Sequence, residues 1–110
     1  MEAIKKCQNL MLGIAIGDAF GAGYENLSMD QVRQRLNLTR YDPYPFNSGH
    51  QAGHYTDDTQ MSIAIAKTLY DAHFNRINLA NSFLEEFRLN RIIGYCELLR
   101  VSLCAQLGAS

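Results

Sequence analysis

Apolar residues recur every three or four positions through much of this chain, the spacing that places side chains on one face of a helix. The pattern predicts helices over residues 2–22, 30–36, 58–73, 79–89 and 95–107. In the first of these, Ile4, Cys7, Ile14 and Phe20 share a face. No segment shows a convincing strand pattern, so the predicted fold class is all-α.

Glycine and capping residues refine these predicted helices. Gly13, Gly17 and Gly21 recur every four residues within the first one. Glycine destabilises a helix interior by about 1 kcal/mol relative to alanine. The stripe therefore predicts close approach of a second helix or of a ligand along this face. Ser28 or Asp30 is expected to cap the second helix, and Asn78 the fourth.

Residues 23–54 are predicted to be mostly irregular, because Asp42-Pro43-Tyr44-Pro45 and several glycines interrupt helices. A loop of this length usually serves a binding or catalytic site. His50 and His54 have the HxxxH spacing that binds zinc on a helix. Since glycines flank both, we interpret them as loop histidines near a polar pocket.

Composition and charge narrow the possible functions. The chain has 110 residues, 47% of them apolar, which is typical of one globular domain or part of one. Its formal net charge is −1 and its basic residues are dispersed. The sequence therefore offers no basic surface for nucleic acid or for an anionic membrane.

Two further features bear on the compartment. Lys5-Lys6 before the apolar residues 10–16 resembles a signal peptide, but Glu2 and Asp18 flank this run, which is too short to span a bilayer. The cysteines are odd in number and form no CxxC pair: Cys7, Cys96 and Cys104. We interpret each as a small buried apolar residue, in a reducing compartment. A cytoplasmic location is the expectation.

Two acidic segments are candidates for chemistry. Thr56-Asp57-Asp58 stands where a glycine-containing loop enters a helix. These residue types are good helix caps, and they are also the hard oxygen ligands that Mg²⁺ prefers. Asp18 and Glu25 are either solvated acids or part of a site, with Asp18 facing polar partners and Glu25 acting as a general base or metal ligand. The residues alone leave both alternatives open.

Taken together, these segments resemble a known family. Gly17-Asp18-Ala19-x-Gly21 with Glu25 four residues on, followed by Gly53-x-Tyr55-Thr56-Asp57-Asp58-Thr59-Gln60-Met61-Ser62, is similar to the ADP-ribosylglycohydrolase family. That family includes the enzyme that reactivates ADP-ribosylated dinitrogenase reductase. Further on, Gly94-Tyr95 resembles its Gly-Tyr-Gly phosphate loop, with Cys96 in place of the last glycine.

The resemblance implies an all-α fold, a site for two Mg²⁺ ions, and hydrolysis of the glycosidic bond between ADP-ribose and a protein side chain. It implies that the metal ligands are Thr56, Asp57 and Asp58. Glu25, Asp57 and Asp58 would be catalytic, with Glu25 taking a proton from a metal-bound water.

Three other positions receive supporting roles from the same resemblance. Asp18 would orient the metal ligands without contacting the metal itself. Gly94 and Tyr95 would lie near the ADP-ribose. The expected partner is an ADP-ribosylated protein or ADP-ribose, with neither nucleic acid nor membrane.

One departure from the family concerns the rest of the metal site. Family members are longer and supply further ligands from a late Asp-x-Asp-Thr motif, which this sequence lacks. Residues 1–110 are therefore expected to form the N-terminal portion of a single domain, with impaired activity. The alternatives are a non-catalytic module that binds ADP-ribose or Mg²⁺, and a helical interaction fragment that self-associates through exposed apolar helix faces.

Overall fold

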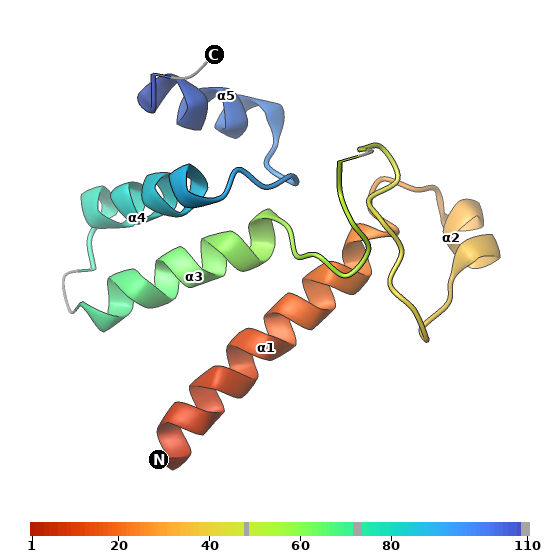
Figure 1. The fold of residues 1–110 in the computed structure, drawn as a ribbon, viewed down its shortest axis with the longest axis horizontal. Coiled ribbons are helices and arrows are strands. Elements are labelled where there is room, and N and C mark those ends of the chain that lie inside the picture. The colour runs from red at the N-terminus through yellow and green to blue at the C-terminus, as the bar shows by residue number, and fades with distance from the viewer. Residues whose placement is uncertain (48, 72–73, 109–110) are drawn as a thin grey trace. The chain divides into compact units, whose positions relative to one another are not determined.

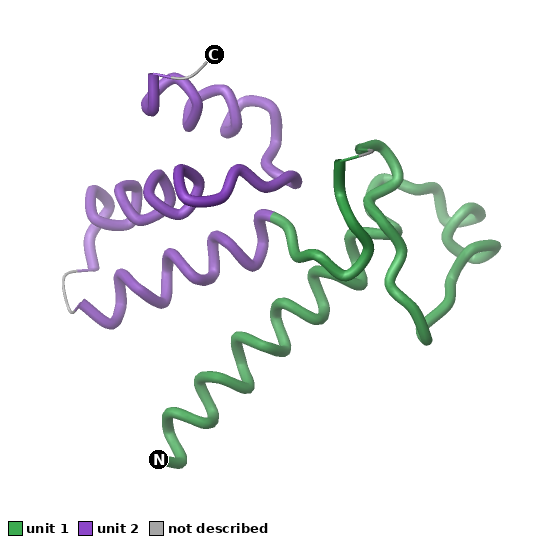
Figure 2. The backbone as a smooth tube through the Cα atoms, in the orientation of Figure 1, with its two compact units in different colours: residues 1–56 green, residues 57–110 purple. Residues whose placement is uncertain are grey.

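The computed structural model describes residues 1–47, 49–71 and 74–108 (Figure 1). It divides into two compact units, Met1–Thr56 (unit 1) and Asp57–Ser110 (unit 2), which are described separately below (Figure 2). Within the described ranges the regular elements are five α-helices and no strand, which confirms the all-α prediction. No helix in these ranges is long and apolar enough to cross a membrane.

Unit 1 consists of helices α1 (Glu2–Ala22) and α2 (Met29–Arg35) and a long loop that follows them. Ser28 rather than Asp30 caps α2. The Ser28 hydroxyl accepts a hydrogen bond from the Gln31 N–H at 3.2 Å, and the Gln31 side chain accepts one from the Ser28 N–H at 2.9 Å. This reciprocal pair satisfies donors that a helix start otherwise leaves without partners.

The loop of unit 1 packs against the end of α1. The Phe20 and Tyr41 rings lie 4.3 Å apart between centroids. Gly23 touches Asp42 so closely that a β-carbon on Gly23 would lie 2.8 Å from the Asp42 backbone oxygen. The Tyr24 hydroxyl donates to Asp42 Oδ2 at 3.2 Å. The loop is thus attached to the last turn of α1 through contacts that require a glycine at position 23.

Within unit 1, the second helix predicted to approach the glycine stripe on α1 is not found. No described atom of unit 1 outside the local helix backbone lies within 4 Å of a β-carbon built on Gly13, Gly17 or Gly21. Several large apolar residues of α1 are exposed instead: Ile4, Leu10, Leu12 and Ile16. The glycine that does meet another segment is Gly23, which follows the stripe.

His50 organises the distal part of the same loop and is buried. Its Nδ1 accepts a hydrogen bond from the Tyr44 N–H at 2.9 Å, and its Nε2 lies 3.0 Å from the His54 carbonyl oxygen. Both ring nitrogens therefore face backbone groups, which does not fit the zinc alternative. His50 also lines a surface cavity of about 560 Å³ together with Arg35, Pro43, Tyr44, Pro45, Phe46 and Asn47.

Unit 2 contains α3 (Asp57–Tyr70), α4 (Arg76–Leu89) and α5 (Glu97–Gln106). Helix α3 packs against α4, and α4 contacts α5. The buried core consists of Phe87, Tyr95 and Leu103, and the Phe87 and Tyr95 rings meet edge to face at 5.4 Å. Partly buried residues surround this core: Met61, Leu84, Ile92, Leu99, Cys104 and Leu107.

Three predictions about this unit need correction. Helix α3 ends at Tyr70, so Asp71 lies in a turn, and predicted helix residues 72–73 lie outside the described residues. Helix α4 begins earlier than predicted, because Asn75 is its cap and accepts a hydrogen bond from the Asn78 N–H at 2.9 Å. Cys96 is exposed before α5 rather than buried.

The other two cysteines differ in their exposure. Cys7 is exposed on α1, contrary to the prediction that it is buried, whereas Cys104 is partly buried beside the core of unit 2. All three thiols are free. Cys104, which packs against the Phe87 core, is thus less exposed than Cys7 and Cys96.

Candidate functional site

In unit 1, Asp18 of α1 contacts Thr56, a residue that is only 1% exposed. The Thr56 N–H donates to Asp18 Oδ2 at 2.8 Å, and the Thr56 hydroxyl donates to Asp18 Oδ1 at 2.5 Å. Hydrogen bonds to a carboxylate are stronger than those between neutral groups. Asp18 therefore fixes both the backbone and the hydroxyl of Thr56, and it faces a polar partner rather than only water.

Asp57 is the first residue of α3, where backbone N–H groups have no partner within the helix. Its N–H donates to the Ile93 carbonyl at 3.1 Å. Its carboxylate lies where a β-carbon on Gly94 would be, and Gly94 has a positive φ of 112°. A side chain at position 94 would meet both a strained backbone and the Asp57 carboxylate. The structure thus brings together Asp57 and Gly94.

Tyr95 follows Gly94 and is buried, with 7% of its surface exposed. Its hydroxyl donates to Gln60 Oε1 at 2.7 Å. Burial, and then the negative charges of Asp57 and Glu86, raise the pKa of the Tyr95 phenol to about 12. The phenol therefore remains neutral through the physiological range and acts as a hydrogen-bond donor inside unit 2.

Asp58 and Glu25 are both exposed to solvent. Asp58 lies in the first turn of α3, where the helix dipole favours negative charge. Glu25 lies in the turn that follows α1, before Asn26, whose φ of 62° is left-handed. The structure places Glu25 in unit 1 and Asp58 in unit 2, and it brings neither into the hydrogen bonds described above.

The donor chemistry of the predicted ligands fits a hard cation in kind. Thr56, Asp57 and Asp58 offer one hydroxyl and two carboxylates on consecutive residues, all oxygen donors of the type that Mg²⁺ takes. In the part of the chain that the structure describes, no group of three or more His, Cys, Asp and Glu residues is arranged to hold a metal. An octahedral ion held here would need further ligands from water or from other groups.

Gln60 is the residue that sequence reasoning missed. Gln60 belongs to the family motif but was given no role, although it stands three positions after Asp57 on the same face of α3. A polar residue within the buried face of a predicted helix is the signal that could have identified it, because a buried amide requires partners.

Comparison with known proteins places the chain among its relatives. The profile of the ADP-ribosylglycohydrolase family matches residues 2–108. An uncharacterized protein of Archaeoglobus fulgidus is 35% identical over 78 residues, which is 69% of this chain and 25% of that protein. ADP-ribosylarginine hydrolase Tri1 of Pseudomonas putida is 33% identical over 98 residues, covering 86% of this chain and 25% of the relative.

A vertebrate relative shows similar coverage. ADP-ribosylhydrolase ARH3 of Gallus gallus is 30% identical over 93 residues, 77% of this chain and 25% of that protein. The chain thus spans about a quarter of the length of the curated relatives it matches. No solved structure matches the chain significantly.

Proposed function

The chain belongs to the ADP-ribosylglycohydrolase family, and from this membership we propose that it takes part in Mg²⁺-dependent hydrolysis of the bond between ADP-ribose and a protein side chain. The observation that carries the proposal is the pair of hydrogen bonds from Thr56 to Asp18. Together these bonds place a fixed hydroxyl directly before two aspartates in the chain. We further propose that residues 1–110 belong to a single domain of that family.

Asp18 prepares Thr56 for a cation. Because the Thr56 hydroxyl donates its proton to Asp18 Oδ1, the lone pairs of the hydroxyl oxygen remain available to a positive ion. The proposed ligands are Thr56, Asp57 and Asp58. A carboxylate that orients a ligand in this way raises metal affinity without touching the metal.

The proposed chemistry uses the remaining acid of the motif. Glu25 is the proposed general base, because an exposed carboxylate can take a proton from the attacking water. Cleavage at the anomeric carbon passes through an oxocarbenium-like transition state. A bound Mg²⁺ would lower the pKa of a water molecule and orient the ribose hydroxyls.

A peptide assay tests this proposal on the full chain. Peptides carrying ADP-ribose on arginine or serine are incubated with Mg²⁺ or with a chelator, and free ADP-ribose is quantified by chromatography. We expect slow release, and only with Mg²⁺, with loss of release in Asp57→Asn and Asp58→Asn. Asp71→Asn is the matched control, because Asp71 is an exposed aspartate in the turn after α3.

The same assay distinguishes the other two functions. A non-catalytic module would be stabilised against heat by Mg²⁺ or ADP-ribose without releasing ADP-ribose. An interaction fragment would respond to neither ligand and would associate as its concentration rises, using exposed apolar residues such as Leu98 and Val101 of α5. Either result would contradict the hydrolytic function for this chain.

A further inference from the structure

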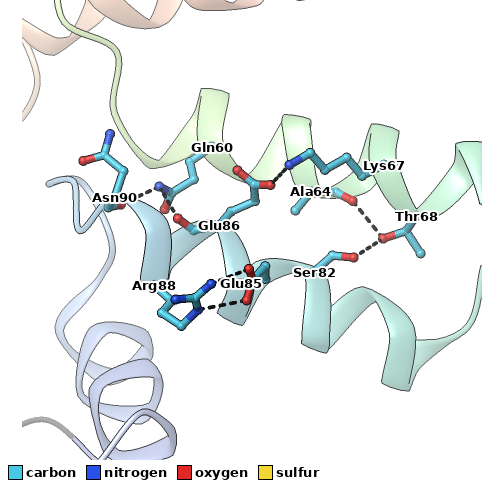
Figure 3. A network of polar contacts seen from close by, with 9 residues as sticks. All are labelled: Gln60, Ala64, Lys67, Thr68, Ser82, Glu85, Glu86, Arg88 and Asn90. Atoms are coloured by element: carbon cyan, nitrogen blue, oxygen red, sulfur yellow. Dashed lines mark hydrogen bonds and ion pairs between the residues drawn. The ribbon is translucent and has the colours of Figure 1, made fainter.

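Gln60 of α3 is a buried amide, 2% exposed, whose hydrogen-bonding groups all have partners. Its Nε2 donates to the carbonyl oxygens of Asn90 at 2.6 Å and Glu86 at 3.1 Å (Figure 3). Its Oε1 accepts from the Tyr95 hydroxyl at 2.7 Å. A reversed amide would place an oxygen against two carbonyl oxygens, so these partners determine its orientation. We call Gln60, Glu86, Asn90 and Tyr95 the Gln60 network.

The Gln60 network holds both ends of the connection between α4 and α5. Asn90 is the C-cap that follows α4, and Tyr95 stands just before Cys96, the N-cap of α5. One side chain therefore contacts the connection at its beginning and near its end. The Tyr95 ring also packs on Phe87, so the second contact is anchored in the core of unit 2.

Between these two contacts lie the two residues that touch Asp57. The Ile93 carbonyl accepts from the Asp57 N–H at 3.1 Å, and the Gly94 backbone lies against the Asp57 carboxylate. Gln60 and Asp57 stand three positions apart, which places them on the same face of α3. The same short connection thus contacts both residues, and of the two Gln60 is the buried one.

We propose that Gln60 is a positioning residue for Asp57: by holding Asn90 and Tyr95 it sets the Ile93–Gly94 backbone against which the Asp57 carboxylate rests. The inference rests on the proposed function only for the statement that Asp57 binds Mg²⁺. Outer partners of a metal ligand typically change metal affinity by about 10- to 100-fold when removed. A residue that only filled the core would change stability without this effect.

Three variants of the full chain separate the two roles. Gln60→Leu removes all three hydrogen bonds of the Gln60 side chain. Tyr95→Phe removes a single hydroxyl and keeps the ring, so it provides a folded variant if Gln60→Leu fails to fold. Thr68→Val is the matched control. Thr68 is equally buried, and its hydroxyl lies 2.8 Å from both Ala64 O and Ser82 Oγ (Figure 3). It stands about three helical turns from Asp57.

Two readouts are measured at a temperature where all variants are folded: the Mg²⁺ dissociation constant by calorimetry, and exchange of the Asp57 backbone amide by NMR without metal. We expect Mg²⁺ affinity to fall about tenfold in Gln60→Leu, or less in Tyr95→Phe, and to stay within about twofold in Thr68→Val. The Asp57 amide should exchange faster in both network variants than in the control.

The outcomes are distinct. If Asp57 amide exchange in the network variants matches that of Thr68→Val, or if they bind Mg²⁺ as wild type does, the positioning role is overturned. If wild-type protein binds no Mg²⁺ but the Asp57 amide responds as expected, the proposed function fails while the positioning role is supported.

Discussion

Units 1 and 2 hold two consecutive residues, Thr56 and Asp57, by different means. In unit 1 one side chain, the Asp18 carboxylate, accepts both hydrogen bonds from Thr56. In unit 2 the support for Asp57 comes from backbone, through the Ile93 carbonyl and the close-lying Gly94. The position of Thr56 depends on one charged side chain. The position of Asp57 depends on all the residues that determine the backbone conformation between α4 and α5. The two residues should therefore respond to different kinds of substitution.

Asp18→Ala should have the largest effect, because it removes the whole support of Thr56 at once. Two charge-assisted hydrogen bonds are lost, and the buried Thr56 groups keep no acceptor from this side chain, so we expect the free energy of unfolding to fall by about 3 to 4 kcal/mol. Urea unfolding in a chelating buffer measures this loss. Asp18→Asn, which keeps one acceptor, should lose about half as much. If the Asp18→Ala protein is as stable as wild type, the Asp18 side chain does not support Thr56 in the way proposed.

Gly94→Ala should damage the backbone support of Asp57. A β-carbon there would need the positive φ of 112° and would collide with the Asp57 carboxylate, so we expect a loss of about 2 to 3 kcal/mol. Gly108→Ala is the control, because Gly108 has a φ of 67° and no described atom beyond its chain neighbours lies within 4 Å of a β-carbon built on it. It should lose only the conformational cost of about 1 kcal/mol. Equal losses would show that the contact with Asp57 carries no energy.

Much of the fold could be predicted from the sequence, because helix formation depends on local period and local caps. Ser28 was one of the two caps expected for α2, and the structure selects it. The start of α4 was not predicted, because Asn75 and Asn78 are both good caps and only the folded chain selects the earlier one. Local patterns thus located helices well and their ends less well.

The candidate site was predictable only in part. Asp18 and Thr56 were singled out, but the contact between them spans 38 positions and has no periodic signal. The resemblance predicts Gly94 near the ADP-ribose, and its contact with Asp57 could be found only from the structure. Gln60 contacts Asn90 and Tyr95, which lie 30 and 35 positions away. The sequence indicates that buried polar side chains need hydrogen-bond partners. Which residues become those partners depends on the tertiary packing.

The Tyr95 phenol offers a test of unit 2 by pH. Because its pKa is raised from 10.0 to about 12, the folded state holds its proton more tightly than the unfolded state does. The resulting stabilisation is complete below about pH 10 and is lost as pH rises toward 12, about 2 kcal/mol in all. Tyr95→Phe should lack this decline in urea unfolding measured without metal. Tyr24→Phe in unit 1 should keep it, because Tyr95 is intact.

The smallest expected effect is a gain in stability, and it lies in unit 1. Gly17 is inside α1, and no described atom of unit 1 outside the local helix lies within 4 Å of a β-carbon built on it. Gly17→Ala should therefore stabilise the chain by about 0.5 to 1 kcal/mol, the difference in helix propensity. Urea unfolding measures the gain. A loss instead would show that a segment or second copy approaches this face of α1 in solution, as the glycine stripe predicted. Unit 1 would then depend on a backbone contact as unit 2 does.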